Sequence, residues 1–387
     1  MFKVRTLNNI SVRGLERLPR DRYEVASDFA SPDAILLRSF NMHDMDIPVG
    51  LKAVGRAGAG VNNIPVERLS ARGIPVFNAP GANANAVKEL VIAGMLLAAR
   101  QICQAWDYAR GLSGSDEEIH QQVESGKKQF AGFELPGRTL GVVGLGAIGV
   151  QVANAARALG MRVVGYDPRI TVERAWQLSS DVEQAATVAE LLTRADFVTF
   201  HVPLVEATRH MISRDRLRDM REGVVILNFA RSGIVDEEAV LEAIDAGRVH
   251  AYVCDFPSNH LRGRQGVTAL PHLGASTAEA EDNCAVMVAE QLRDYLENGN
   301  IVNAVNFPQV VLPRQGAARL ALVNVNRPDM VGQISHDLGR CGLNIVHMLN
   351  ESKGDLAYTL VDVESEINAD VAETIRRIDG VLNVRVL

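Results

Sequence analysis

The sequence is poor in the residues that mark secreted and metal-binding proteins. It has only four cysteines in 387 residues, and they are scattered along the chain at Cys103, Cys254, Cys284 and Cys341. No CxxC pair and no Cys/His spacing of a zinc site occurs among them. Scattered cysteines fit free thiols better than a disulfide framework or a zinc site, so we expect four free thiols and no bound metal. Free thiols are typical of the reducing cytoplasm, where we expect the protein to be located.

Long apolar runs and blocks of positive charge are also missing. No segment reaches the ~18 consecutive apolar residues that suggest a membrane helix. The first residues, Met1 to Arg5, have neither the apolar stretch nor the small-residue cleavage site of a signal peptide. The formal net charge is −7, and no basic cluster stands out to bind a phosphate backbone. We therefore expect no membrane and no nucleic acid among the partners.

The composition that remains is that of an ordinary globular protein, with 47% hydrophobic and 22% charged residues. The length allows two or three domains. Short apolar runs alternate with helical patterns, which predicts an α/β fold with parallel sheets. The main predicted strands are residues 34–37, 51–55, 74–77, 139–143, 162–166, 197–201, 223–228 and 251–254, and long helical patterns span residues 89–112 and 282–298.

The stretch Gly144-Leu-Gly146-Ala147-Ile148-Gly149 follows one of these strands and leads into a small-residue helix, residues 151–159. Glycines in such a turn allow a sharp bend, close approach of a pyrophosphate and close packing of helix on strand. The next strand ends in Asp167, 18 residues beyond Gly149, near the spacing of a carboxylate that accepts ribose hydroxyls. The motif therefore predicts a Rossmann site. The charge of Asp167 favours NAD over NADP, because it would repel a 2′-phosphate.

The last part of the chain follows a different pattern. Residues 306–318 contain Pro308, Pro313 and Gly316 and are predicted to be a linker. Beyond them, strand, helix, strand, strand, helix and strand patterns follow one another up to Leu387. This βαββαβ order predicts a ferredoxin-like unit.

Two residue types suited to hydride transfer stand near predicted strand ends. Arg231 lies in the segment Asn228-Phe-Ala-Arg-Ser-Gly, and His272 lies in Pro271-His-Leu-Gly-Ala-Ser-Thr277. Arginine offers a bidentate fork to a carboxylate, and histidine can move a proton near neutral pH. The simpler alternatives are a structural salt bridge for Arg231 and an ordinary loop histidine for His272.

With these segments in view, the chain resembles the D-isomer-specific 2-hydroxyacid dehydrogenases that carry a C-terminal ACT domain. The glycine loop, His201-Val-Pro-Leu and the segments around Arg231 and His272 carry the resemblance. It implies a Rossmann-type NAD-binding domain inserted in a flavodoxin-like α/β substrate domain, followed by the ferredoxin-like ACT domain. The implied limits are 1–88 and 282–305 for the substrate domain, 89–281 for the NAD-binding domain, 306–318 for the linker and 319–387 for the ACT domain.

The resemblance also assigns roles to single residues. Arg231 would hold the substrate carboxylate and carbonyl, and His272 would be the general acid and base. Asp255 and Ala230 would contact the nicotinamide side of the cofactor, and His201 would either bind the cofactor or be structural. The full set implied for the cofactor is Gly144, Gly146, Ala147, Ile148, Gly149, Asp167, His201, Val202, Pro203, Ala230 and Asp255.

For the substrate, the resemblance implies 3-phosphoglycerate, oxidised at its 2-hydroxyl to begin serine synthesis. Arg38 and Arg56 follow predicted strands, and we expect them to bind the phosphate. Amides of the loop that includes Ala57 and Gly58 would bind the carboxylate, with Asn83 nearby. In the ACT unit, Asn324, Asn326 and Asn344 would bind serine as a feedback effector across a junction between subunits of a homo-oligomer, a dimer or tetramer. They could equally be turn and cap residues.

One position departs from the family pattern. The family has a glutamate five residues after the equivalent of Asp255, where it partners the catalytic histidine, and this chain has His260 there. Either His260 replaces the carboxylate, a local gap shifts the alignment, or activity is weakened. Two other functions stay open: a glyoxylate or hydroxypyruvate reductase, and a cofactor-sensing binding protein similar to the C-terminal binding protein corepressors. The ACT unit disfavours both.

Overall fold

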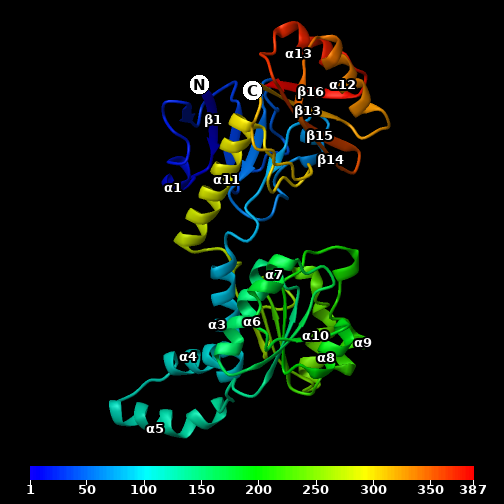
Figure 1. Cartoon of the computed structure of the whole chain (residues 1–387). Helices are drawn as coiled ribbons and strands as arrows, with labels where there is room; N and C mark the ends of the chain where they lie inside the picture. Colours follow the sequence, from blue (N-terminus) through cyan, green and yellow to red (C-terminus); the bar gives the residue numbers. More distant parts are fainter. The chain divides into compact units, whose positions relative to one another are not determined.

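The computed structural model describes residues 1–387 and divides into two compact units. The first unit contains Met1–Asn83 together with Ala278–Leu387, and the second contains Ala84–Thr277 (Figure 1). The second unit is therefore inserted between the two segments of the first, as predicted.

The N-terminal part of the first unit is a five-stranded parallel sheet with the strand order β2-β1-β3-β4-β5. This is the flavodoxin-like order, so that prediction is confirmed. No strand was predicted before residue 34, because neither β1 nor β2 contains a continuous apolar run, and only Val4 and Leu7 of β1 are buried. The elements are β1 (Phe2–Leu7), α1 (Val12–Leu15), β2 (Tyr23–Ala26), β3 (Ala34–Leu37), β4 (Ala53–Arg56), α2 (Val66–Ser70) and β5 (Val76–Phe77).

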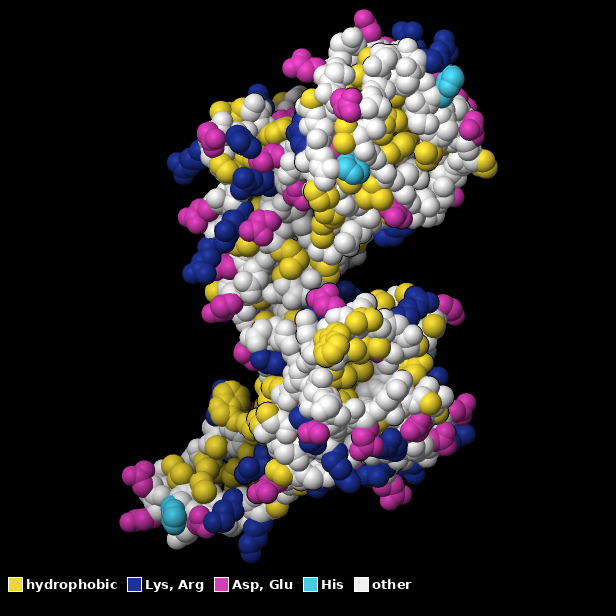
Figure 2. Space-filling model, viewed as in Figure 1, with side chains coloured by type: hydrophobic (Ala, Val, Ile, Leu, Met, Phe, Trp, Pro, Cys, Tyr) yellow, Lys and Arg dark blue, Asp and Glu magenta, His cyan; other side chains and the backbone are white.

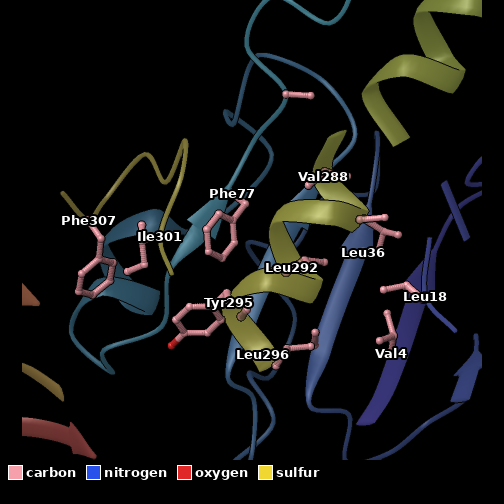
Figure 3. Packing of buried hydrophobic residues seen from close by; sticks show 14 of the residues in the cluster. Val4, Leu18, Leu36, Phe77, Val288, Leu292, Tyr295, Leu296, Ile301 and Phe307 are labelled. Carbon is pink, nitrogen blue, oxygen red and sulfur yellow. The ribbon is translucent and has the colours of Figure 1, made fainter. Parts of the chain in front are cut away.

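Helix α11 (Ala278–Asn298) packs on this sheet. It lies so close to β4 that a Cβ added at Gly55 would be 2.8 Å from the side chains of Val288 and Leu292. Figure 3 shows the resulting core, with Val288 and Leu292 facing the strands and Tyr295 beside Phe77.

The second unit is a seven-stranded parallel sheet in the order β12-β11-β10-β9-β6-β7-β8. Read from β8, this is the Rossmann order, in which the strand order reverses between β6 and β9. Its strands are β6 (Thr139–Val143), β7 (Arg162–Tyr166), β8 (Glu183–Gln184), β9 (Phe197–Phe200), β10 (Val224–Asn228), β11 (Val249–Cys254) and β12 (Val267–Ala269).

Helices cover both faces of this sheet. The core on one face includes residues of α3 (Ala84–Arg100) and α6 (Ala147–Ala158), and the core on the other includes residues of α8 (Val188–Arg194), α9 (Arg214–Asp219) and α10 (Glu237–Asp245). The short elements α7 (Val172–Gln177), η2 (Glu206–Thr208) and η3 (Ser232–Ile234) lie in the connections.

The long helix predicted over residues 89–112 is wrong in its continuity. Helix α3 ends at Arg100, and Gln101 has a φ of 48°, in the left-handed region that breaks a helix. Helix α4 (Ile102–Arg110) starts after this break and is followed by α5 (Asp116–Gly126) and η1 (Lys127–Phe130). We call residues 101–133 the arm. Figure 1 shows α4 and α5 extending away from the sheet of the second unit. No residue of either helix is buried.

The C-terminal part of the first unit is an antiparallel sheet in the order β14-β15-β13-β16. With two helices in the sequence βαββαβ, it has the predicted ferredoxin-like topology. The elements are β13 (Ala318–Val325), α12 (Met330–Arg340), β14 (Ile345–Lys353), β15 (Leu356–Val363), α13 (Ala369–Arg376) and β16 (Val381–Val386). Helices α12 and α13 cover one face of this sheet, while Ala321, Val323, Tyr358 and Leu360 on the other face share a core with Tyr295 and Phe307.

Three side chains of the C-terminal sheet hold the end of α11, and we call Arg319, Tyr358 and Arg385 the helix-end clamp. Arg319 donates to the carbonyl of Asn298 at 2.9 Å, and Tyr358 donates to that of Gly299 at 2.6 Å. Arg385 donates to the carbonyls of Tyr295 and Leu296 at 3.2 and 2.8 Å. The last carbonyls of a helix have no partner within the helix and carry its negative dipole end, so two cations and a hydroxyl satisfy them.

The guanidinium of Arg319 is itself held by Asp362. The two side chains are fully buried and form a bidentate pair, with N–O distances of 2.5 and 2.8 Å.

Of the helices in the structure, none combines the length and the apolar character needed to cross a bilayer.

Candidate active site

Three glycines shape the loop between β6 and α6, each for a different reason. Gly144 has a φ of 92°, and a Cβ there would lie 2.6 Å from the carbonyl oxygen of His201. A Cβ at Gly149 would collide with the carbonyl group of Gly144, so this glycine lets α6 pack against the loop. Beside Gly146 there is open space. This is where a pyrophosphate would approach the backbone of a dinucleotide site.

The carboxylate of Asp167 ties this loop to the next strand. One oxygen accepts from the amide of Leu145 at 2.8 Å, and the other accepts from the amide of Arg169 at 2.8 Å. The open space at Gly146, the first amides of α6 at Ala147 and Ile148, and the carboxylate after β7 fit a bound NAD. These residues would hold its pyrophosphate and ribose.

The segment His201-Val202-Pro203 follows β9 beside the glycine loop. The amide of His201 donates to the carbonyl of Val143 at 2.8 Å, and its ring Nε2 lies 3.1 Å from the hydroxyl of Thr199. Burial lowers the pKa of His201 to about 3, so this ring is neutral at working pH. These contacts account for a structural role, and a cofactor contact by His201 stays a prediction.

Arg231 stands just past the end of β10, in a turn that Asn228 holds. Asn228 is fully buried; its amide group donates to the carbonyl of Arg231 at 2.9 Å and its oxygen accepts from the amide of Ala230 at 3.2 Å. The Arg231 side chain is exposed, with one nitrogen bonded to the carbonyl of Ala230 at 2.6 Å. No acidic side chain pairs with Arg231, so the structure does not support the alternative, a structural salt bridge. The role of Asn228 could have been recognised from its place at the strand end.

Asp255 holds the backbone that follows His272. Its carboxylate is 1% exposed, and it accepts from the amides of Leu273 at 2.7 Å and Gly274 at 2.8 Å. His272 has a φ of 55°, a conformation that costs a non-glycine residue energy and often marks a functional site. Its ring is exposed and packs edge-on against Phe256, with 5.2 Å between centroids. The structure therefore places Asp255 behind the loop that presents the histidine.

His260, predicted as a partner of His272, lies in the turn after β11 with its side chain exposed. The rings of the two histidines form no hydrogen bond in this structure. The turn is anchored instead by Ser258, whose hydroxyl donates to the carboxylate of Glu237 at 2.6 Å. Neither Ser258 nor Glu237 was predicted to matter.

In the first unit, Arg38 and Arg56 stand at the adjacent ends of β3 and β4, where Leu37 pairs with Arg56. The Nε of Arg56 donates to the carbonyl of Arg38 at 3.0 Å and to the side chain of Asn63 at 3.1 Å. Asn63 in turn donates to the carbonyl of Arg38 at 3.1 Å. A side chain at Gly58 would collide with the guanidinium of Arg56, so this glycine makes room for it. Sequence reasoning missed Asn63, whose only signal was its place in the loop after Arg56.

The amides of Ala57 and Gly58 are already engaged within this loop. Ala57 donates to the carbonyl of Leu37 at 2.7 Å, and Gly58 donates to that of Arg56 at 2.8 Å. The amides of Ala59 and Gly60 in the same loop have no acceptor within the protein. Asn83, the last residue of the N-terminal segment of the first unit, has a half-buried side chain.

The three asparagines of the C-terminal unit do not meet within one chain. Asn324 and Asn326 lie at the end of β13, and the buried side-chain oxygen of Asn324 has no hydrogen-bond partner. Asn344 precedes β14, whose first residue pairs with Val363, which in turn pairs with Ala318 at the start of β13. From the rise of a strand, Asn344 is about 20 Å from the other two.

Comparison with known proteins supports the same reading of these motifs. Residues 96–274 match the family described as D-isomer specific 2-hydroxyacid dehydrogenase, NAD binding domain. The chain is 37% identical over 350 residues to D-3-phosphoglycerate dehydrogenase of Methanocaldococcus jannaschii, covering 88% of this chain and 63% of that protein. It is 33% identical over 349 residues to D-3-phosphoglycerate dehydrogenase of Haemophilus influenzae, covering 87% of this chain and 81% of that protein. The chain thus spans less than two thirds of the first relative.

A solved structure agrees with these sequence matches. The NAD⁺-bound 3-phosphoglycerate dehydrogenase of Entamoeba histolytica matches with a TM-score of 0.61 and 26% identity, over 79% of this chain and 98% of that one. From the identity to relatives over most of its length, the chain belongs to the D-isomer-specific 2-hydroxyacid dehydrogenases, NAD-dependent oxidoreductases that include the D-3-phosphoglycerate dehydrogenases.

Proposed function

We propose that this protein oxidises the 2-hydroxyl of D-3-phosphoglycerate with NAD to give 3-phosphohydroxypyruvate, the first step of serine synthesis. The observation that carries the proposal is that one parallel sheet presents the glycine loop, Arg231 and His272 after strands whose carboxyl ends share one edge. Ligands of such sheets bind at that edge. The relatives named above support the choice of substrate.

The residues divide the reaction between them. Arg231 binds the substrate carboxylate and the oxygen that becomes the carbonyl, since a guanidinium donates to two oxygens at once. His272 accepts the hydroxyl proton during oxidation and returns it during reduction. When bound, NAD supplies the acceptor for the hydride that leaves C2. Asp255 fixes the loop of His272 so that the imidazole is positioned before the substrate arrives.

For residues of the first unit we also propose a substrate-binding role. Arg38 and Arg56 bind the phosphate, and amides of the loop after β4 bind the carboxylate, with Asn83 nearby. Because Ala57 and Gly58 donate within the protein, Ala59 and Gly60 are the better donors of that loop. We assign substrate binding to residues 1–88 and 282–305, NAD binding to 89–281, a linker to 306–318 and an ACT function to 319–387.

A steady-state assay tests this function. Purified protein with NAD and 3-phosphoglycerate should produce NADH continuously, whereas NADH with glyoxylate should react far more slowly. Changing Arg231 or His272 to Ala should lower kcat/KM by about 100-fold or more. Arg264→Ala, which removes an exposed arginine paired with Asp245 in the same unit, should not. A glyoxylate rate above the 3-phosphoglycerate rate would assign the protein to the reductases.

We also propose that serine binds between the C-terminal units of two subunits, through Asn324 and Asn326 of one and Asn344 of the other. The distance between these asparagines within one chain supports a site shared by two chains. The buried oxygen of Asn324 without a partner supports a ligand that donates a hydrogen bond, such as the serine ammonium. Millimolar serine should then inhibit the wild-type enzyme and raise its melting temperature, and Asn324→Ala should remove both effects. Unchanged activity and melting temperature would rule serine out.

A homo-oligomer held by the arm fits the same scheme, and we propose a second copy of the chain as the partner of the arm. The arm exposes Ile102 and Trp106 on α4 and Val123 on α5, and Figure 2 shows apolar side chains gathered along it. Two short helices without a single buried residue are stabilised when a partner covers their apolar side.

The four free cysteines support a cytoplasmic location.

A further inference from the structure

One of the two arginines proposed to bind the phosphate already forms an ion pair with an acidic side chain. The carboxylate of Glu281, in the first turn of α11, lies 2.5 Å from the Nη1 of Arg38. The two side chains are 34% and 46% exposed for Arg38 and Glu281, so solvent and ligands reach the pair. The Nε of Arg56 donates to the carbonyl of Arg38 and to the side-chain oxygen of Asn63.

The position of Glu281 is set by its helix rather than by chance. The next residue, Asp282, accepts from the hydroxyl of Ser11 at 2.5 Å and pairs with Arg13 at 3.2 Å. One turn later Ala285 packs so closely on α1 that a Cβ at Gly14 would lie 2.6 Å from it. The start of α11 is thereby fixed against α1, and Glu281 is aimed at the end of β3.

Cys284 lies one turn beyond Glu281, and its thiol is influenced by the charges of Arg38, Arg56 and Glu281. Burial raises the pKa of its thiol, the charges of Arg38 and Arg56 lower it, and that of Glu281 raises it. The thiol is therefore within electrostatic range of all three charged groups. The Arg38–Glu281 pair and Arg56 therefore lie at the adjacent ends of β3 and β4.

We propose that Glu281 is a specificity-determining residue that lowers the affinity of this site for the substrate phosphate. This inference rests on the proposed function. A phosphate carries nearly two negative charges, and it reaches Arg38 only by opening the Arg38–Glu281 pair or by sharing the guanidinium with Glu281. In either case Glu281 competes with the phosphate and keeps the ligand from binding too tightly to be released.

The charge of Glu281 also makes the site selective among anions. A ligand with a single charge gains too little from Arg38 to displace a carboxylate that is already in place. A phosphate gains more, because its charge is larger and its three oxygens match the planar fork of the guanidinium. A 2-hydroxy acid without a phosphate does not contact the pair, so its affinity does not depend on the charge of Glu281.

The test uses Glu281→Gln, which keeps a hydrogen-bond acceptor beside Arg38 and removes the charge. It should lower the KM for 3-phosphoglycerate and the inhibition constant of inorganic phosphate about three- to ten-fold. The KM for glycerate, which has no phosphate, should stay the same. Glu281→Ala should change both constants in the same direction. Glu290→Gln is the matched control, since it removes the same charge from an exposed arginine pair on the same helix.

A double-mutant cycle shows whether the effect passes through Arg38. In the Arg38→Ala background, Glu281→Gln should give little or none of the gain. Constants that stay unchanged or rise in Glu281→Gln, or an equal gain without Arg38, would overturn the proposal. The protection that inorganic phosphate gives against thermal unfolding provides a readout independent of turnover. If the wild-type protein makes no NADH from 3-phosphoglycerate, the proposed function fails, while stronger phosphate protection in Glu281→Gln than in wild type still tests Glu281.

Discussion

Asp255 is a buried carboxylate whose two oxygens hold the backbone after His272, so its effect on catalysis is expected to be indirect. In Asp255→Asn, neither amide keeps a charged acceptor, because one faces a neutral carbonyl oxygen and the other faces an NH₂ group. We expect a loss of about 1–3 kcal/mol in unfolding free energy and a fall in kcat larger than any change in the KM for NAD. Denaturant unfolding and steady-state kinetics measure the two effects. Asp236→Asn, at the start of α10, is a suitable control because Asp and Asn cap helices equally well.

His201 links stability to pH. Burial lowers its pKa to about 3, whereas the unfolded chain has an ordinary histidine, so the unfolded state binds more protons between these two values. Stability should therefore fall as the pH drops below about 6.5, and about 1–2 kcal/mol should be lost by about pH 5 through this residue alone. His201→Gln should flatten that part of the profile. Urea unfolding of both proteins near neutral pH and in mild acid checks this, and parallel profiles would contradict it.

At the scale of elements, the glycine loop separates binding from packing. Ala in place of Gly146 meets open space, so the fold should keep its melting temperature while NAD binding weakens. Ala in place of Gly149 collides with the carbonyl of Gly144 and pushes α6 off the strand, so we expect both the melting temperature and NAD binding to fall. Thermal unfolding and NAD titration by calorimetry distinguish the two variants. Equal melting temperatures would show that α6 adjusts without cost.

The helix-end clamp predicts a strong asymmetry between single and double substitutions. Arg319→Met leaves the carboxylate of Asp362 buried without its partner and should cost about 3–5 kcal/mol of unfolding free energy. Arg319→Met with Asp362→Leu should recover most of that loss, because no uncompensated charge remains. Arg214→Met, in an exposed pair with Glu242, should cost about 1 kcal/mol or less. A double variant as unstable as the single one would mean that the capping of α11 matters more than the charge.

For the whole molecule, the arm predicts the oligomeric state. The chain has two tryptophans, both exposed, Trp106 on α4 at 60% and Trp176 on α7 at 86%. If a second copy covers the arm, Trp106→Asp buries a charge in the contact and should weaken the dimer by about 100-fold or more. Trp176→Asp should leave the mass in solution unchanged. Light scattering over a range of concentrations measures both, and a Trp106→Asp protein with unchanged mass would remove the arm from the interface.

Much of this molecule was accessible from local sequence rules. The glycine loop and Asp167 are close in sequence and depend on backbone conformation, so turn chemistry and the period of apolar residues were enough to predict them. The same holds for the βαβ alternation and the βαββαβ order at the C-terminus. The break at Gln101 escaped because the helical pattern of apolar residues continues across it, and only a left-handed backbone conformation separates the two helices.

The pairing of distant charges could be decided only by the tertiary structure. Glu281 meets Arg38 across more than half of the chain because α11 returns from the inserted unit and packs on β4. Arg319 reaches the end of α11 because the second face of the C-terminal sheet is apolar and is buried against the rest of the first unit. Nothing in the local sequence around either charge specifies its partner. Which carboxylate or carbonyl it meets depends on how helices and sheets bury their apolar faces.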